Sequence, residues 1–177
     1  PHSSHRAPKV DLNGIPFIGI GDINERGELI NDKVRLVSED IYWEQRESFK
    51  ISKGDFAFCR VASVGKVIDL TDTANRIYSF SPTMAIIKPL NINAEFLRIY
   101  LSSNHFQKIA MSLVSGSTRV SLGMQNLRRL HIILPSQDEQ KKISNSLSVL
   151  NHKIQLTKDS ISSAQNLKKG LLQQMFV

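Results

Sequence analysis

Short apolar runs alternate with Gly, Asn, Asp and Ser residues over the first 134 positions of the chain, a pattern that predicts strands and turns. The runs predicted to be extended are Ile15–Ile20, Leu29–Val37, Phe56–Val61, Lys66–Leu70, Ile77–Phe80, Met84–Lys88 and Leu130–Leu134. Turns are predicted at Asn24–Gly27, at Lys53-Gly54-Asp55 and at Ser63-Val64-Gly65. The first part of the chain is therefore expected to contain a sheet.

Apolar positions spaced three and four residues apart predict helices within the same part of the chain. Asn93 is a plausible N-cap for a helix that includes Phe96 and Leu101, and a second helix is predicted at Asn104–Leu113. A short helical turn is expected near Met124–Arg128. Because strands and helices do not alternate regularly, we expect an α+β fold with a mixed or antiparallel sheet rather than a doubly wound one.

The pattern changes at Pro135, which divides the chain into predicted domains 1–134 and 135–177. Ser136 and Glu139 form a capping box, and no proline follows before Phe176. Apolar residues then recur as in a coiled-coil seam, with a register shift after Ala164. The predicted helix-pairing residues are Ile143, Leu147, Leu150, Ile154, Ile161, Leu167, Leu171 and Met175.

A helix of this extent is about 60 Å long, and a small domain cannot bury such a seam along its full length. It needs a second helix as a partner. A hairpin broken at Asn151 or at Ser162-Ser163 is the alternative, and the unbroken helix is the stronger prediction.

Charge is unevenly distributed along the chain, which carries a net charge of +7. From Asp22 to Asp55, nine acidic and six basic residues give a net charge of −3, whereas Thr73 to Gln137 contains seven basic residues and one acid, Glu95. Such asymmetry favours a positive face that binds phosphate backbones. A basic surface that serves only solubility is the alternative.

No arrangement of residues in the sequence indicates catalysis, a metal site or a cofactor. The histidines lack metal-ligand spacing, and Gly19-Ile20-Gly21 lacks the third glycine of a dinucleotide-binding loop. Cys59, the one cysteine, lies in an apolar run and is predicted to be buried and inert, while His131 is predicted to be structural. We expect no membrane span and a cytoplasmic location.

Two polar loops are the best candidates for a DNA interface. One is the turn that contains Arg60, Ser63 and Lys66. The other lies in an acid-free stretch and consists of Ser115, Gly116, Ser117, Thr118 and Arg119. Hydroxyl and backbone N–H groups bind phosphate oxygens, and arginine binds phosphate or guanine. Arg6 and Lys9 are secondary candidates on charge and position alone, and an ordinary surface loop fits the same composition.

Four segments in order resemble half of a type I restriction–modification specificity subunit. Gly14–Ile18 followed by Asp22-Ile23 is similar to the opening of its target-recognition domains, and Lys53-Gly54-Asp55 followed by Gly65 is similar to a hairpin of that family. Ser115–Thr118 with the run into Pro135 resembles the closing segment. The chain from Pro135 to Phe176 resembles the conserved spacer helix, and its end is the most distinctive of the four.

The resemblance implies a non-enzymatic DNA-binding component of a bacterial defence complex. A full subunit of this family has two recognition domains, each reading one part of a bipartite site on double-stranded DNA. Its spacer helices pair antiparallel and dock methyltransferase and restriction subunits, so the partner helix would come from a tandem half or from a homodimer mate. The family usually has a further strand before Gly14, so the chain is expected to be a fragment, a half-subunit or one half of a tandem subunit.

Two other functions remain open at this point. One is a protein-assembly module whose coiled coil recruits partners. The other is the recognition end of a single-chain restriction–methylation enzyme.

Overall fold

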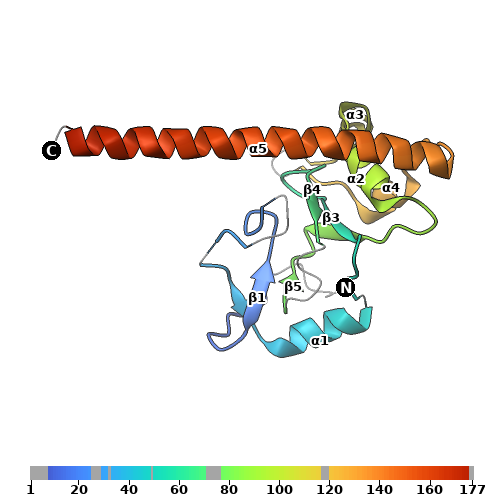
Figure 1. The fold of residues 1–177 in the computed structure, drawn as a ribbon. Coiled ribbons are helices and arrows are strands. Elements are labelled where there is room, and N and C mark those ends of the chain that lie inside the picture. Colours follow the sequence, from blue (N-terminus) through green and yellow to red (C-terminus); the bar gives the residue numbers. More distant parts are fainter. Residues whose placement is uncertain are drawn as a thin grey trace. The chain divides into compact units, whose positions relative to one another are not determined.

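The computed structural model describes residues 8–24, 29–31, 33–48, 50–70, 77–116 and 120–175. The chain divides into two compact units, unit 1 at residues 1–133 and unit 2 at residues 134–177 (Figure 1).

The described residues of unit 1 form two three-stranded sheets. The strands of the first sheet, in spatial order, are β2 (Leu36–Val37), β1 (Ile15–Ile18) and β5 (Ser79–Phe80). β1 is antiparallel to β2 and parallel to β5. The second sheet, antiparallel throughout, has the order β4 (Val67–Asp69), β3 (Phe56–Cys59) and β6 (Met84–Ile87). The predicted α+β class with mixed and antiparallel pairing is confirmed.

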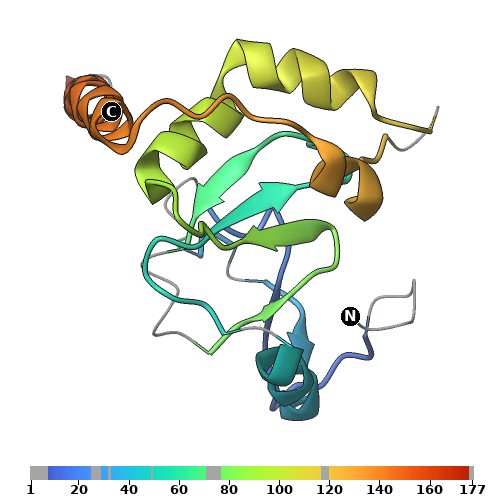
Figure 2. The ribbon, with the colours of Figure 1, turned by 90° about the vertical axis from the view of Figure 1, so that its right-hand side faces the viewer.

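Strand β3 is buried on both faces and separates two hydrophobic clusters. Phe56 and Phe58 pack with Leu97, Leu101 and Phe106 in one cluster, whereas Ala57 packs into the other with residues of both sheets. Figure 2 shows the corresponding layers, with α2 (Ala94–Ser102) and α3 (Asn104–Ser112) on one side of the β4-β3-β6 sheet and β1 on the other. This explains why the run lacks the apolar–polar alternation of a half-exposed strand.

Helix α1 (Glu39–Ser48) was not predicted from the sequence. Only Tyr42 is buried along it, so the apolar periodicity that indicates a helix is weak. The amide of Gln45 binds the open edge of β5, because its Nε2 donates to the Phe80 carbonyl and its Oε1 accepts from the Phe80 N–H, each at 2.8 Å. The Gln45 side chain thus forms hydrogen bonds with backbone groups of β5 that would otherwise be unpaired at an exposed strand edge.

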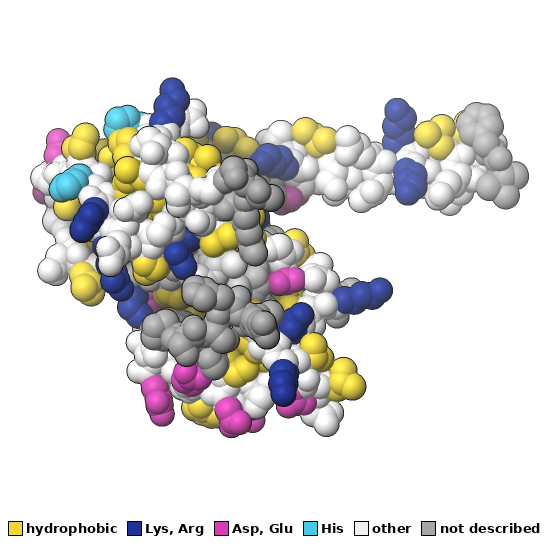
Figure 3. Space-filling view, turned by 180° about the vertical axis from the view of Figure 1, so that it is seen from behind, with side chains coloured by type: hydrophobic (Ala, Val, Ile, Leu, Met, Phe, Trp, Pro, Cys, Tyr) yellow, Lys and Arg dark blue, Asp and Glu magenta, His cyan; other side chains and the backbone are white. Residues whose placement is uncertain are grey.

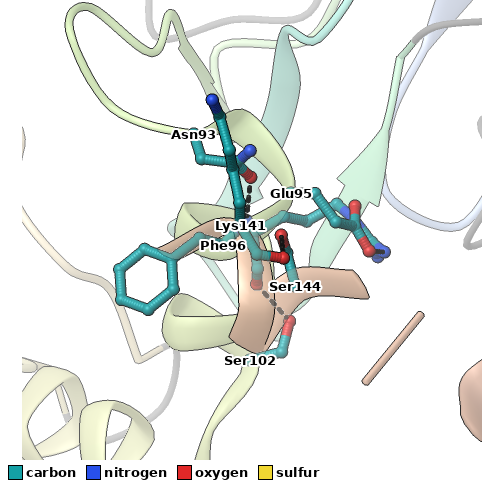
Figure 4. A network of polar contacts seen from close by, with 7 residues as sticks. Asn93, Glu95, Phe96, Ser102, Lys141 and Ser144 are labelled. Atoms are coloured by element: carbon teal, nitrogen blue, oxygen red, sulfur yellow. Dashed lines mark hydrogen bonds and ion pairs between the residues drawn. The ribbon is translucent and has the colours of Figure 1, made fainter. Parts of the chain in front are cut away.

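The predicted helices that follow β6 are confirmed. The Asn93 side chain accepts a hydrogen bond from the Phe96 N–H at 2.8 Å and caps α2 (Figure 4). Ser103 caps α3 in the same way, and a short α4 spans Met124–Arg129. Local capping chemistry therefore sets the beginnings of α2 and α3.

Two of the predicted strands need correction. Leu130–Leu134 forms no strand, although Leu130 and Ile132 pack against the cluster around Phe58. Alternate side chains are partly buried in this segment, but its backbone forms no ladder of hydrogen bonds with another strand. His131, which was predicted to lie in an apolar strand, is exposed. Within the described part of Leu29–Val37, only Leu36–Val37 belongs to a strand. Most of the Asn24–Gly27 turn lies outside the described residues.

Unit 2 consists mainly of one helix, α5 (Gln137–Met175), of 39 residues. The predicted unbroken helix is confirmed and the hairpin alternative is excluded. Within it the Ser144 hydroxyl donates to the Lys141 carbonyl (Figure 4). At its start the Glu139 carboxylate accepts from the Ser136 N–H and hydroxyl, at 2.9 Å and 2.7 Å. The capping box predicted from Ser136 and Glu139 is therefore present.

The capping box predicts a pH effect at the start of α5. Hydrogen bonds from the Ser136 side chain and backbone lower the pKa of Glu139. A carboxyl whose pKa is lower in the folded state stabilises that state above its unfolded pKa, and the effect is lost as the pH falls through the folded value. We expect an NMR titration to place the Glu139 midpoint below that of an unstructured glutamate. Ser136→Ala should raise it toward the ordinary value, and an unchanged midpoint in this variant would contradict the assignment.

Candidate nucleic-acid interface

The turn between β3 and β4 is built by backbone geometry that exposes polar groups. Cys59 N–H donates to the Lys66 carbonyl at 2.8 Å and Gly65 N–H to the Cys59 carbonyl at 3.0 Å, which closes the turn. Ala62 and Gly65 have positive φ values of 65° and 93°. Between these bonds Ser63 and the Lys66 side chain are exposed. The turn therefore presents a hydroxyl and an ammonium group to solvent.

The second predicted loop lies directly beside this turn. Ala62 N–H donates to the Val120 carbonyl at 3.0 Å, and Leu122 N–H donates to the Arg60 carbonyl at 2.8 Å. Ser115 and Ser121 exchange two backbone hydrogen bonds at 2.9 and 3.0 Å, which close the loop at its base. Segments far apart in the sequence thus form one surface, which we call the two-loop surface: residues 60–66, 114–116 and 120–122.

Gln107 on α3 fixes the β3–β4 turn to the helical layer. Its Nε2 donates to the Gly65 carbonyl at 2.8 Å and to the Leu101 carbonyl at 2.6 Å. An added Cβ at Gly65 would lie 1.7 Å from the Gln107 Oε1, so a side chain at position 65 would displace this amide. Sequence reasoning missed Gln107, because a lone glutamine on an amphipathic helix carries no signal of such a contact.

Arg60 is partly buried and is already bound within the protein. Its Nη1 donates to the Leu122 carbonyl at 3.1 Å and its Nη2 to the Pro82 carbonyl at 2.7 Å. Burial lowers the pKa of the guanidinium, an effect that the nearby Cys59 partly opposes. Its Nε atom is buried and has no hydrogen-bond partner among the described residues. Unlike Lys66, Arg60 is held by backbone carbonyls instead of projecting freely into solvent.

The structure brings together some of the predicted DNA-binding residues and not others. Arg60, Ser63, Lys66, Ser115 and Gly116 all belong to the two-loop surface. Lys9 is exposed near the start of β1, and no hydrogen bond among the described residues connects it to the two loops. The remaining predicted residues lie outside the described part of the chain: Arg6, Ser117, Thr118 and Arg119.

The basic residues of unit 1 differ in whether they are already paired. Lys88 binds Asp55 at 2.5 Å, and Arg98 binds Glu95 through two hydrogen bonds. Among the described residues, the exposed cations whose side chains make no hydrogen bond or ion pair include Lys66, Lys108, Arg128 and Arg129. On the face in Figure 3, acidic side chains gather at the lower end, where α1 and β1 lie in Figure 1. The uneven charge of the sequence is thus also uneven in space.

The predicted helix-pairing residues of α5 are all exposed. Their exposed fractions range from 37% for Leu147 to 71% for Met175. Apolar side chains repeated along 39 residues form a stripe that is typical of a helix with a partner.

The described residues offer no candidate for a metal site or a membrane span. They contain no group of three His, Cys, Asp or Glu side chains that could hold a metal ion. None of their helices is long and apolar enough to cross a membrane. Cys59 is a free, buried thiol, as predicted, and its Sγ donates to the Val61 carbonyl at 3.2 Å.

A sequence model of the family described as the type I restriction modification DNA specificity domain matches residues 6–166. The chain belongs to this family. The match covers both the two-loop surface and most of α5, so the specificity domain includes the long helix. The family resemblance predicted from the four sequence segments is confirmed.

Two curated relatives are specificity subunits. The chain is 29% identical over 136 residues to the type I restriction enzyme EcoBI specificity subunit of Escherichia coli, covering 74% of this chain and 27% of the relative. It is 26% identical over 147 residues to the putative type I restriction enzyme MjaX specificity subunit of Methanocaldococcus jannaschii, covering 78% and 34%. The chain therefore spans about a third of the length of these relatives.

Among solved structures, the chain is similar to the S subunit of the type I restriction-modification system from M. genitalium. The sequence identity is 20% and the TM-score 0.48, over 82% of this chain and 37% of that one.

The specificity-domain motifs around Gly54 have a structural explanation. Gly54 has a φ of 89°, in the left-handed region that favours glycine. The buried Asp55 carboxylate accepts from the Ser52 N–H at 2.8 Å and binds Lys88. Lys53-Gly54-Asp55 therefore folds the entry to β3, at the opposite end of this strand from the two-loop surface.

Proposed function

We propose that this specificity domain recognises a DNA sequence on double-stranded DNA through the two-loop surface. The main support for this proposal is that backbone hydrogen bonds join the two polar loops, which come from distant parts of the sequence. Together they place Ser63, Lys66 and Ser115 on one exposed surface. Family membership supports the proposal, since the family is defined as a DNA specificity domain.

The chemistry of this surface suits a duplex. Hydroxyl groups and exposed backbone N–H groups bind phosphate oxygens, and the Lys66 ammonium neutralises a phosphate charge. Gly116, with a φ of 100°, belongs to a loop whose backbone can approach a ligand closely. Reading all four base pairs requires the major groove, so we propose that the loop containing Ser115–Arg119 reads base edges there.

We further propose that α5 pairs with a second spacer helix, from a tandem half or from a second copy of the chain. The exposed apolar seam supports this pairing. The pair would set the distance between two recognition domains on a bipartite site. It would also dock methyltransferase and restriction subunits, which carry out the chemistry, so that the specificity domain itself holds no catalytic group.

Lys66→Ala tests the DNA interface directly. We expect the slope of log K against log salt concentration for duplex DNA to fall in magnitude by about one, because one phosphate contact is lost. The measurement is a fluorescence-anisotropy titration of the 177-residue chain at several salt concentrations.

Lys53→Ala is the matched control for this experiment. Lys53 is also exposed, and it lies before β3, whereas Lys66 follows it, so the two variants have the same net charge but differ in position. We expect the slope of Lys53→Ala to match that of the wild type. Equal slopes for the wild type and both variants would show that Lys66 does not contact a DNA phosphate.

The exposed seam also favours an assembly module as a second candidate function. If the chain forms helix-mediated complexes but binds duplex DNA with no salt dependence and no sequence preference, the assembly function is correct and the DNA proposal is wrong.

A further inference from the structure

Arg60 is the residue through which three separate segments of unit 1 meet. Its backbone N–H donates to the Thr83 carbonyl at 2.9 Å, and its carbonyl accepts from the Leu122 N–H at 2.8 Å. Its guanidinium adds bonds to the carbonyls of Leu122 and Pro82. The end of β3, the turn between β5 and β6, and the 120–122 segment are therefore all connected through one residue.

The two ends of the guanidinium act on different partners. Nη1 and Nη2 bind carbonyls from two segments, an arrangement that suits the planar guanidinium with its two separated donors. A lysine ammonium carries its three donors on one nitrogen and would hold the same two carbonyls in a different geometry. The shape of the side chain, as well as its charge, is therefore required.

Burial also distinguishes Arg60 from the other cations near the two loops. Its Nε is buried, and its two terminal nitrogens already have protein acceptors, whereas the Lys66 side chain is exposed and makes no hydrogen bond or ion pair with a described residue. A DNA phosphate would have to compete with two carbonyls for Arg60, but not for Lys66.

We infer that Arg60 is a positioning residue that holds the two DNA-binding loops in register, rather than a residue that contacts DNA. This inference rests on the proposed function and revises the role of Arg60 predicted from the sequence. A positioning residue affects discrimination between DNA sequences, because base contacts depend on the relative placement of the loops. It has little effect on the number of phosphates neutralised.

Two variants separate charge from geometry. Arg60→Lys keeps the charge and loses the two-ended contact, whereas Arg60→Gln loses the charge as well. Both are compared with Lys66→Ala in anisotropy titrations against random duplex DNA and against a site selected from a random pool. Thermal unfolding of each variant is measured first, so that the titrations are done at a temperature at which the variant is folded. If Arg60→Gln does not fold, the test uses Arg60→Lys alone.

We expect both Arg60 variants to lose roughly tenfold of the preference for the selected site, since they lose the guanidinium bond that joins the two loops at Leu122 and the one that anchors Arg60 to Pro82. The salt slope should stay at the wild-type value even in Arg60→Gln, whereas Lys66→Ala lowers it by about one. A slope lowered by about one in Arg60→Gln would show a phosphate contact and overturn the inference. Wild-type discrimination in Arg60→Lys would overturn it as well.

Hydrogen exchange tests the same residue without DNA. The amides of Ala62 and Leu122 donate between the two loops, so they should exchange faster in Arg60→Lys, while the Ala57 and Phe58 amides of β3 stay protected. Unchanged exchange at Ala62 and Leu122 would overturn the inference even if DNA binding is weaker. If these amides exchange faster in Arg60→Lys but the wild-type chain shows no preference between DNA sequences, the proposed function is overturned instead.

Discussion

Gly14→Ala is expected to lower the free energy of unfolding of unit 1 by on the order of 3 kcal/mol, the upper part of the range for overpacking. A Cβ at this position would lie 2.0 Å from the Val37 carbonyl oxygen and 2.5 Å from its carbon. Both atoms belong to the backbone of β2, which pairs with β1 at Ile15. Because no flexible side chain can move aside, β1 and β2 must separate.

The measurement is chemical denaturation followed by circular dichroism. Gly21→Ala is the matched control, since an added Cβ there has no atom within 4 Å, and it should unfold at about the wild-type midpoint. If both variants unfold at the same midpoint, the close approach of β1 and β2 at Gly14 is wrong. A loss of stability in Gly14→Ala but not in Gly21→Ala would also explain why the family motif begins with a glycine.

Charged substitutions in the helix seam are expected to have the largest effect on assembly. Leu150 and Ile154 are exposed by 54% and 53%, one helical turn apart on the seam. Burial of two such side chains against a partner contributes about 4 kcal/mol, and buried carboxylates would add a further cost. Replacing both with aspartate should therefore raise the dissociation constant for self-association more than roughly a hundredfold.

Sedimentation equilibrium or light scattering of the whole chain measures this effect. We expect the wild type to self-associate, because each copy carries the same unpaired seam. Val149→Asp is the control, since Val149 is also exposed, by 57%, but lies off the seam. A wild type that stays monomeric at every concentration would contradict pairing between copies of this chain, and an equal loss of association in Val149→Asp would contradict pairing through these residues.

The long helix could be predicted from the sequence because its signals are local. Ser136 and Glu139 specify its start, and the apolar repeat with no internal proline specifies its continuation. The caps of α2 and α3 are local in the same sense. By contrast, α1 has only one buried residue, and its contact with β5 through Gln45 depends on the tertiary fold.

The run at Leu130–Leu134 shows why an alternating pattern alone does not establish a strand. Leu130 and Ile132 pack against a cluster that contains Phe58, and this packing produces the alternation without strand pairing. No feature of the run itself distinguishes packing against the core from pairing with another strand. Both arrangements place alternate residues on one face.

The candidate site was predictable in composition but not in geometry. Both loops could be chosen for their hydroxyl, glycine and basic residues. The bonds from Ala62 to Val120 and from Leu122 to Arg60 join positions far apart in the sequence, and no local pattern indicates them. For the same reason the sequence could not show that the Arg60 guanidinium binds two backbone carbonyls.

A competition experiment tests most directly whether this specificity domain prefers one DNA sequence. The chain is used to select a site from a random duplex pool, and the dissociation constants for that site and for a scrambled version are measured at the same salt concentration. We predict that the selected site binds on the order of a hundredfold more tightly, since each mismatched base pair costs about 1–3 kcal/mol. Equal dissociation constants for the two duplexes would contradict sequence recognition by this chain.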